Sequence, residues 1–222
     1  TSPIFDPQDP SRYFSFMGQR ADKNPVELIK TELSDNEYKL LDWDGTVRLN
    51  ILPGLNTQVT YSNQYVGSFG GYFLPSTNTK TNMSEANRSY GQTDKSAVEW
   101  LVNYNKSFGD HSVKAMAGYS WQSITNSGFS ATNKQFANDG TTYNSLGQGE
   151  WGLEEGHDGT SSYKNNSKLI AFFGRLNYDY MSKYLLTLSL RYEGSSKFGI
   201  NNKWGYFPAV SAGWRLSKEN FM

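Results

Sequence analysis

Seven segments of this chain alternate apolar with polar residues at a period of two, and this pattern limits the fold more than any other feature of the sequence. In residues 184–193, which read YLLTLSLRYE, every second side chain is Tyr or Leu, and most of those between are polar. Such a segment predicts a β-strand with one apolar and one polar face. The seven predicted strands are residues 41–51, 56–66, 98–108, 112–122, 168–180, 184–193 and 206–217.

The predicted strands are long, at roughly ten or more residues against an average of ~5–6. A strand that crosses a bilayer at a tilt needs ~9–11 residues. The predicted connections alternate between short turns, near 53–55, 109–111 and 181–183, and much longer segments. This asymmetry is typical of outer-membrane barrels. The long segments have about 25 residues near 70–95, about 40 near 125–166 and about 10 near 195–204, beyond or close to the ~12–15 at which loops become uncommon in soluble domains.

Aromatic residues make up 15% of the chain, and we expect them to collect at the ends of the predicted strands. Rings with an apolar body and a polar tip favour the two membrane–water interfaces, where they form girdles around a barrel. One predicted girdle lies beside the short turns and the other beside the long loops. The first contains Tyr104, Phe108, Tyr178, Tyr180 and Tyr184, and the second Tyr65, Tyr119, Trp121 and Tyr192.

Several classes of function are disfavoured by composition. The 21 Lys+Arg balance the 21 Asp+Glu, which gives no reason to expect a nucleic-acid partner. There is no Cys, hence no disulfide framework and no thiolate metal site. The two histidines, His111 and His157, have no nucleophile or metal ligand at a recognisable spacing. The acidic stretch 154–158 lacks the spacing of an EF-hand loop, so a solvated loop is favoured over a Ca²⁺ site. We therefore predict no enzyme activity, cofactor or metal.

The fold class that these patterns favour is all-β: an antiparallel meander of about seven strands that forms part of a large transmembrane β-barrel. A barrel has to close, because hydrocarbon cannot satisfy unpaired backbone groups. Seven strands would leave two edges open, so we expect residues 1–222 to be a partial barrel domain, with 1–36 an extracellular loop region. The alternatives are a passive porin-like barrel and a soluble carbohydrate-binding β-sandwich, which also alternates.

Residues 191–216 read RYEGSSKFGINNKWGYFPAVSAGWRL. This run closely resembles the SusC/RagA family of TonB-linked outer-membrane transporters of Bacteroidetes, and weaker similarity extends over 24–29, 52–55 and 118–122. Tyr192-Glu193 stands where the family usually has Arg-Asp, and Ile200 where Pro is common. The residues that carry the motif are Gly194, Ser195, Ser196, Phe198, Trp204, Gly205, Tyr206, Phe207, Pro208 and Trp214.

The resemblance implies uptake of glycans or peptides across the bacterial outer membrane, with a SusD-like surface lipoprotein as partner and energy supplied through the TonB complex. The plug and TonB box of that family have no counterpart in these residues, so the resemblance places energy coupling in another part of the protein. Outer-membrane lipid would cover the apolar face. The polar face would line the interior, with Asp42, Arg48, Glu99, Asn103, Lys114, Arg175, Asn177, Ser189 and Arg191.

Aromatic residues in the predicted loops are the candidate contacts for a ligand or partner. An exposed ring can stack on the apolar face of a sugar. The alternative is that these rings pack loop against loop or against a protein partner, since aromatic residues also dominate interfaces. The candidates are Tyr143, Trp151 and Tyr163 in the 125–166 loop, Trp204 in the motif, and Tyr72, Phe73 and Tyr90 in the 70–95 loop.

Overall fold

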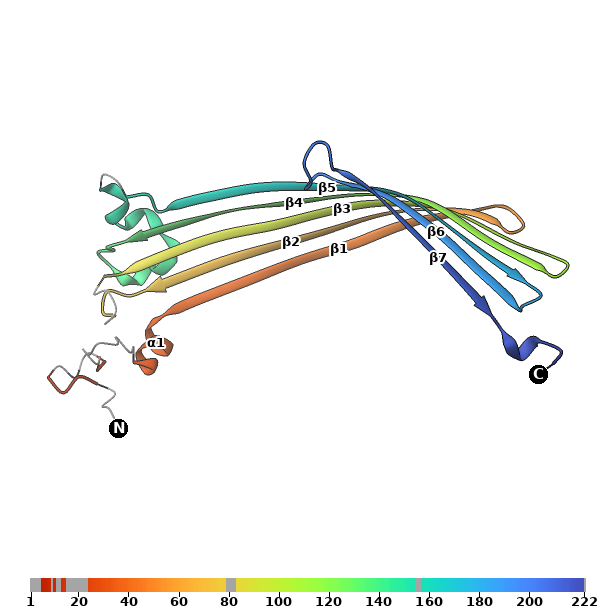
Figure 1. The fold of residues 1–222 in the computed structure, drawn as a ribbon. Helices are drawn as coiled ribbons and strands as arrows, with labels where there is room; N and C mark the ends of the chain where they lie inside the picture. Colours follow the sequence, from red (N-terminus) through yellow and green to blue (C-terminus); the bar gives the residue numbers. More distant parts are fainter. Residues whose placement is uncertain are drawn as a thin grey trace. The chain divides into compact units, whose positions relative to one another are not determined.

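A single sheet of seven strands, arranged side by side in chain order, dominates the computed structural model (Figure 1). The structure describes residues 5–8, 10, 13–14, 24–78, 83–154 and 157–221. Among them, no helix has the length and apolar character needed to span a bilayer. The elements are α1 (Pro25–Thr31), β1 (Leu33–Leu52), β2 (Leu55–Leu74), β3 (Glu85–Phe108), β4 (His111–Lys134), β5 (Thr160–Tyr180), β6 (Tyr184–Ser195) and β7 (Trp204–Trp214).

All seven predicted strands are present, so the predicted antiparallel meander is confirmed, but their predicted lengths are wrong for β1 to β5. These strands have 20 to 24 residues instead of about half that number. The residues by which these strands exceed the prediction are rich in Gly, Ser, Asn and Thr. Neither face is apolar enough there to produce a period-two pattern. The prediction for β7 began two residues late and ended three residues late, because the strand already starts at Trp204 and the chain leaves the sheet after Trp214 to form a 3₁₀ turn at Leu216–Lys218.

The predicted long loops are correspondingly too long. The connections that remain are residues 75–84, 135–159 and 196–203. Tyr72 and Phe73 therefore lie on β2, Tyr90 on β3 and Tyr163 on β5, rather than in loops. The N-terminal region 1–36 contains α1 and the first residues of β1, and its extracellular location stays a prediction.

The register of the last three strands places equivalent side chains on one face. On β6, Leu186, Leu188 and Leu190 stand opposite Tyr178, Leu176 and Gly174 of β5, and opposite Ala212, Val210 and Pro208 of β7. Directly opposed residues of antiparallel strands share a face. The apolar sets predicted for the separate strands thus combine into one surface, which we call the apolar face; the opposite surface is the polar face.

The three short turns need backbone conformations that favour glycine, and two of them have a glycine at the position with positive φ. Gly54 and Gly109 adopt φ of 83° and 55°. The third turn places Met181 and Ser182 at φ of 55° and 57°, and the amide of Lys183 donates to the carbonyl of Tyr180 at 2.9 Å. Two successive left-handed residues characterise the type I′ turn that matches the twist of a β-hairpin.

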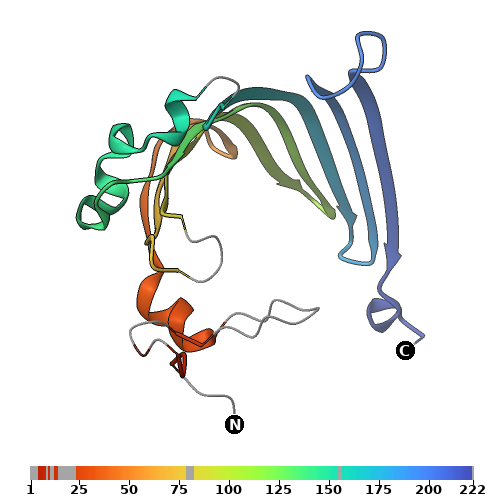
Figure 2. The same ribbon diagram turned by 90° about the vertical axis from the view of Figure 1, so that its left-hand side faces the viewer.

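The chain divides into two compact units, which cut across the strands. The first unit comprises the described residues within Thr1–Lys39, Val66–Gln92 and Asn126–Lys164. Its small core consists of the buried Phe73, Ala86 and Phe136, with Tyr143 and Leu146 packed against it. The last three residues belong to the β4–β5 connection, which contains 3₁₀ turns at Asp139–Asn144, Leu146–Gln148 and Trp151–Leu153 (Figure 2).

The second unit comprises the described residues within Leu40–Tyr65, Thr93–Thr125 and Asn165–Met222. Its sheet has no second layer among the described residues, and its apolar side chains are open to the surroundings. Leu190 is 48% exposed and Trp214 is 55% exposed. A soluble sandwich would enclose these side chains between two sheets, so the sandwich alternative is wrong.

Candidate functional site

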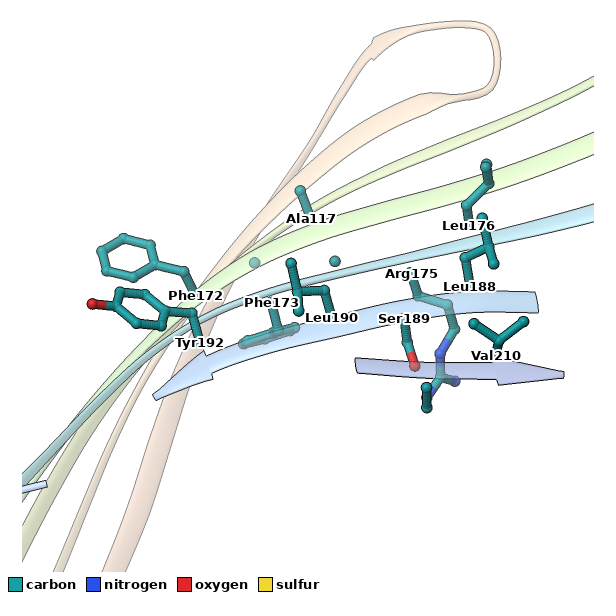
Figure 3. Close-up of a pocket in the computed structure, with 13 residues that line it drawn as sticks. Ala117, Phe172, Phe173, Arg175, Leu176, Leu188, Ser189, Leu190, Tyr192 and Val210 are labelled. Carbon is teal, nitrogen blue, oxygen red and sulfur yellow. The ribbon is translucent and has the colours of Figure 1, made fainter. Parts of the chain in front are cut away.

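The functional surface of the second unit is the pair of faces of β5, β6 and β7. Figure 3 shows Leu188 and Leu190 on one side of the ribbon, and Ser189 and Arg175 on the other. Gly174 has no side chain, so the apolar face has a shallow depression of about 640 Å³ at this point. The apolar side chains around it come from three strands: Phe172, Leu176, Leu188, Leu190 and Val210.

The polar face is held together by hydrogen bonds between neighbouring strands. The Arg48 guanidinium donates to Gln58 Oε1 at 2.6 and 3.0 Å, and the Gln64 amide donates to Asp42 at 3.0 Å. Thr187 and Asn177 bond at 2.9 Å in the same manner on β6 and β5. Members of the predicted interior-facing set are therefore linked to polar groups of adjacent strands.

One aromatic cluster interrupts this polar face. Arg191 forms an ion pair with Glu193, and its guanidinium lies 5.5 Å from the centre of the Phe173 ring. Phe207 stands opposite Arg191 on β7. The Phe173 ring also covers Gly118, where an added methyl group would lie 2.5 Å from ring carbons. Gly118 thus makes room for a large ring on the interior side of the sheet.

A row of rings lies beside the short turns, and we call it the turn-end band. His111 stacks with Phe108 at 5.3 Å between ring centres, and its Nδ1 lies 2.7 Å from the Tyr178 hydroxyl. Tyr184 stacks with Tyr180 at 6.3 Å and with Trp214 at 6.4 Å. Four of the five predicted members lie in this row, which also contains His111 and Trp214; the fifth, Tyr104, lies four residues before Phe108 on β3. The band consists of Phe108, His111, Tyr178, Tyr180, Tyr184 and Trp214.

Glu219 fastens the end of this row to the segment that follows β7. Its carboxylate accepts hydrogen bonds from the Trp214 indole at 3.0 Å, the Tyr184 hydroxyl at 3.0 Å and the Lys183 ammonium at 2.9 Å. The indole bond, the largest cause, and the Lys183 ammonium hold the pKa of Glu219 below its ordinary value. No sequence pattern indicated this contact, because it depends on the Leu216–Lys218 turn, which brings Glu219 back to the sheet.

The second band of rings lies within β1 to β5 and not at their ends, so the predicted position was wrong for Tyr65, Tyr119 and Trp121, whereas Tyr192 lies near the end of β6 as predicted. Its members are eight to ten residues from the strand end at the nearest short turn, or for Tyr206 from the end of β7 at Trp214, close to the ~9–11 that a tilted bilayer crossing requires. Partners on neighbouring strands touch: Trp43 with Tyr61 at 5.2 Å, Tyr119 with Phe172 at 5.2 Å and Tyr192 with Tyr206 at 4.3 Å. The band consists of Trp43, Tyr65, Trp100, Tyr119, Trp121, Phe172, Tyr192 and Tyr206.

The motif residues form the β6–β7 connection and its flanks. Trp204 stands opposite Gly194 and stacks on Tyr192 at 4.7 Å, and a methyl group at Gly194 would lie 2.6 Å from the indole. The Ser196 hydroxyl accepts the amide of Lys168 at 2.8 Å, and Ser195 Oγ accepts that of Lys197 at 3.2 Å. Of the others, Gly205, Tyr206, Phe207, Pro208 and Trp214 lie on β7, and Phe198 is exposed in the connection.

The side chains of Tyr143 and Trp151 pack the β4–β5 connection against neighbouring strands and against itself. The Tyr143 ring covers Gly71 and stacks with the Arg88 guanidinium, and its hydroxyl donates to Asp35. This hydrogen bond, first, and burial raise the pKa of Tyr143. Trp151 stacks with His157 at 4.3 Å and lies under the Lys134 ammonium at 5.3 Å.

Tyr163 lies on the other face of the sheet. Its ring covers Gly128 of β4 and its hydroxyl reaches towards Gly91 of β3. Odd-numbered β5 residues and even-numbered β4 residues share a face throughout, since Phe173 covers Gly118 in the same way. The predicted candidates therefore separate onto two faces, and alternation assigns Tyr72 of β2 as well as Tyr163 of β5 to the side of Phe173 and Arg175.

The acidic stretch provides no metal site in the described part of the chain, where no cluster of three or more His, Asp or Glu is found. Glu155 and Gly156 lie outside the described residues. The Asp158 carboxylate accepts the backbone amide of Thr160 at 2.9 Å and its hydroxyl at 2.8 Å, and these two bonds lower the pKa of Asp158. Asp158 therefore caps the start of β5.

Comparison with known proteins assigns the chain to a family. The family model described as "TonB dependent receptor-like, beta-barrel" matches residues 4–221. TonB-dependent receptor P3 of Formosa agariphila is 35% identical over 201 residues, covering 90% of this chain and 20% of that protein. TonB-dependent receptor SusC of Bacteroides thetaiotaomicron is 29% identical over 217 residues, covering 90% and 19%. The chain thus spans about a fifth of the length of the curated relatives it matches.

Two solved structures share the fold. The RagAB peptide transporter superposes with a TM-score of 0.80 at 19% identity, over 90% of this chain and 22% of that one. The RagAB peptide importer in the closed-closed state gives a TM-score of 0.83 at 18% identity, over 95% and 23%. At this identity the likeness concerns the seven-strand arrangement.

Proposed function

Because the chain belongs to the TonB dependent receptor-like β-barrel family, we propose that it forms part of the wall of a transporter that imports glycans or peptides. Members of this family are transporters and not enzymes, and their barrels are integral to the outer membrane. A SusD-like lipoprotein as partner and energy coupling through TonB complete the proposal, and both follow from the SusC/RagA resemblance.

The observation that carries the proposal is the register of β5, β6 and β7. It aligns Leu186, Leu188 and Leu190 with apolar residues of both neighbours, and these side chains are covered by no second layer in the described part of the chain. The residues between them, such as Ser189 and Arg191, are polar. A sheet with these two faces suits a wall between hydrocarbon and a polar interior. The two aromatic bands, one bilayer crossing apart, support the same orientation.

The import function is tested in cells with the full-length protein. We expect uptake of a fluorescent oligosaccharide or peptide to depend on this protein, to stop when TonB is deleted, and to stop when an uncoupler collapses the proton gradient. A passive porin-like barrel would give uptake that continues in both conditions, and this result would overturn the proposal.

A further inference from the structure

The interior-side surface around Tyr163 has the character of a sugar-binding platform. The ring lies across β4, because a methyl group at Gly128 would be 2.9 Å from ring carbon Cε1. The hydroxyl extends to β3, 3.7 Å from the position of a methyl group at Gly91. Two glycines on neighbouring strands thus let the ring lie over backbone. The residue remains 55% exposed, so the ring is also accessible.

Tyr163 stands outside the expected bilayer crossing. It lies seventeen residues before Tyr180, the residue at the short turn, on a strand that runs without interruption from Thr160 to Tyr180. A tilted strand crosses the hydrocarbon in ~9–11 residues. Alternation along β5 assigns Tyr163 to the same side as Phe173 and Arg175, the polar face. The ring is therefore placed at the mouth, on the side that faces the interior.

The groups around this ring are hydroxyls and amides without charge. Ser161 and Ser130 lie beside it and bond to each other at 2.8 Å, and Asn87 bonds to Thr132 at 2.7 Å across β3 and β4. Ser68 on β2 donates to the carbonyl of Gly91 at 3.3 Å. The residues that alternation assigns to this face are uncharged over 161–173 of β5, 116–132 of β4, 87–93 of β3 and 56–74 of β2. Charge returns at the margins of this stretch, with Lys95 on β3 and with the ion pair between Lys134 and Glu85 at 3.2 Å.

We propose that Tyr163 is a contact for a neutral oligosaccharide, with a pyranose ring stacked on its exposed face and sugar hydroxyls bonded to the neighbouring hydroxyls and amides. A peptide has charged termini and often charged side chains, whereas the residues next to the ring are uncharged and, at the margin of this surface, Lys134 and Glu85 are paired with each other. A neutral sugar presents an apolar ring face edged by hydroxyl groups, which matches an aromatic ring with uncharged polar neighbours. This inference rests on the proposed import function and names its substrate class.

The test uses the purified full-length receptor in detergent and four variants: Tyr163→Ala, Tyr163→Phe, Gly128→Ala and Phe129→Ala. Phe129 is the matched control, because it is also 55% exposed and lies on β4, but it contacts Tyr90 on the opposite face. The probes are heptasaccharides of α-1,4-glucose, β-1,4-glucose and β-1,4-mannose, and tryptic peptides of casein. Binding is measured by calorimetry, and the fold of each variant by its heat-modifiable mobility on gels.

We expect one of the heptasaccharides to bind, and Tyr163→Ala to weaken its affinity about tenfold, which corresponds to about 1.4 kcal/mol, because the sugar ring loses the surface on which it stacks. Tyr163→Phe keeps the ring and should stay within about threefold of wild type. Gly128→Ala would bring a methyl group to 2.7 Å from the Tyr90 carbonyl oxygen and 2.9 Å from the ring, so the folded fraction of this variant should bind more weakly than wild type. Phe129→Ala should have no effect.

Two results would overturn the inference. One is equal affinity of the wild type and the folded Tyr163→Ala variant for the bound oligosaccharide. The other is binding of the casein peptides and of no heptasaccharide, which would remove the glycan class while the import function stands. Uptake that continues after TonB is deleted would instead contradict the proposed function itself.

Discussion

At the scale of single residues, the two glycines of the short turns differ in what surrounds them. Both have positive φ, but a methyl group at Gly54 would lie 2.1 Å from the carbonyl oxygen of Asn105, whereas nothing lies within 4 Å at Gly109. A left-handed conformation costs a non-glycine residue roughly 1–2 kcal/mol. Gly54 has to satisfy a steric requirement in addition to this conformational one.

We therefore expect Gly109→Ala to reduce the stability of the full barrel by about 1 kcal/mol, and Gly54→Ala to reduce it by at least about 1 kcal/mol more. The measurement is urea unfolding of the full-length protein in lipid vesicles, followed by tryptophan fluorescence. Equal losses for the two variants would show that the contact between the Gly54 and Asn105 backbones is not close.

The carboxylate of Glu219 gives a prediction that depends on pH. Its folded-state pKa lies below the ordinary value, so the ionised form is the one that the Trp214, Tyr184 and Lys183 contacts stabilise. Stabilisation of this kind is present above the unfolded-state pKa and is lost as the pH falls through the lowered folded-state value. The attachment of residues 215–221 should therefore be firm at neutral pH and loosen in acid.

Glu219→Gln should speed backbone hydrogen exchange in residues 215–221 at neutral pH, and the difference from wild type should shrink in acid below the lowered pKa. Mass spectrometry of the full-length protein measures both. A variant that exchanges like the wild type at neutral pH would show that Glu219 does not hold this segment.

At the scale of the strand, β6 offers adjacent positions with opposite surroundings. Leu188 lies halfway between Tyr184 of the turn-end band and Tyr192 of the second band, on the apolar face. Its position corresponds to the bilayer midplane, where Arg on the lipid side of a barrel costs ~2–4 kcal/mol. Ser189 is next in sequence and faces Arg175 and Ala209 on the polar face.

Leu188→Arg should therefore lower the stability of the full-length barrel by ~2–4 kcal/mol, and Ser189→Arg by much less. Folding into lipid vesicles, measured as the fraction with heat-modifiable mobility on gels, compares the two. Losses of similar size would mean that the lipid side and the interior side have been assigned to the wrong faces.

The sequence predicted what the apolar–polar contrast encodes, namely seven strands, two faces and the short turns. It could not predict the outer halves of β1 to β5, because Ser, Asn, Gly and Thr supply no contrast there. Tyr163 shows the consequence, since it was predicted in a loop and lies on a strand.

Contacts between distant residues were also beyond sequence patterns. The ring of Tyr143 packs on Gly71, and Tyr163 packs on Gly128, through glycines whose role depends on which strands are neighbours. Trp204 and Gly194 are a partial exception, because both belong to the recognised motif, but only the β6–β7 register explains why they occur together.

At the scale of the whole molecule, the outermost strands have an unpaired edge. In the described part of the chain, β1 pairs only with β2 and β7 only with β6, and every residue of β1 is exposed. Unpaired backbone groups cannot be satisfied by hydrocarbon, and in water an exposed edge promotes aggregation.

Residues 1–222 expressed alone should therefore fail to insert into vesicles and should aggregate without detergent, whereas the full-length receptor folds to a heat-modifiable species. Gel mobility and light scattering of both proteins measure this. A fragment that stays monodisperse in water would contradict the membrane interpretation of the apolar face.

The position of the β4–β5 connection has a consequence for access to the pore. Phe136 and Tyr143 attach this longest described connection to Phe73, Gly71 and Arg88, on the side of the strands opposite to Tyr163. Moving it to the opposite side of the strands would break up that core. Under the proposed transporter function, a gate over the cargo would accordingly have to come from segments other than 136–146.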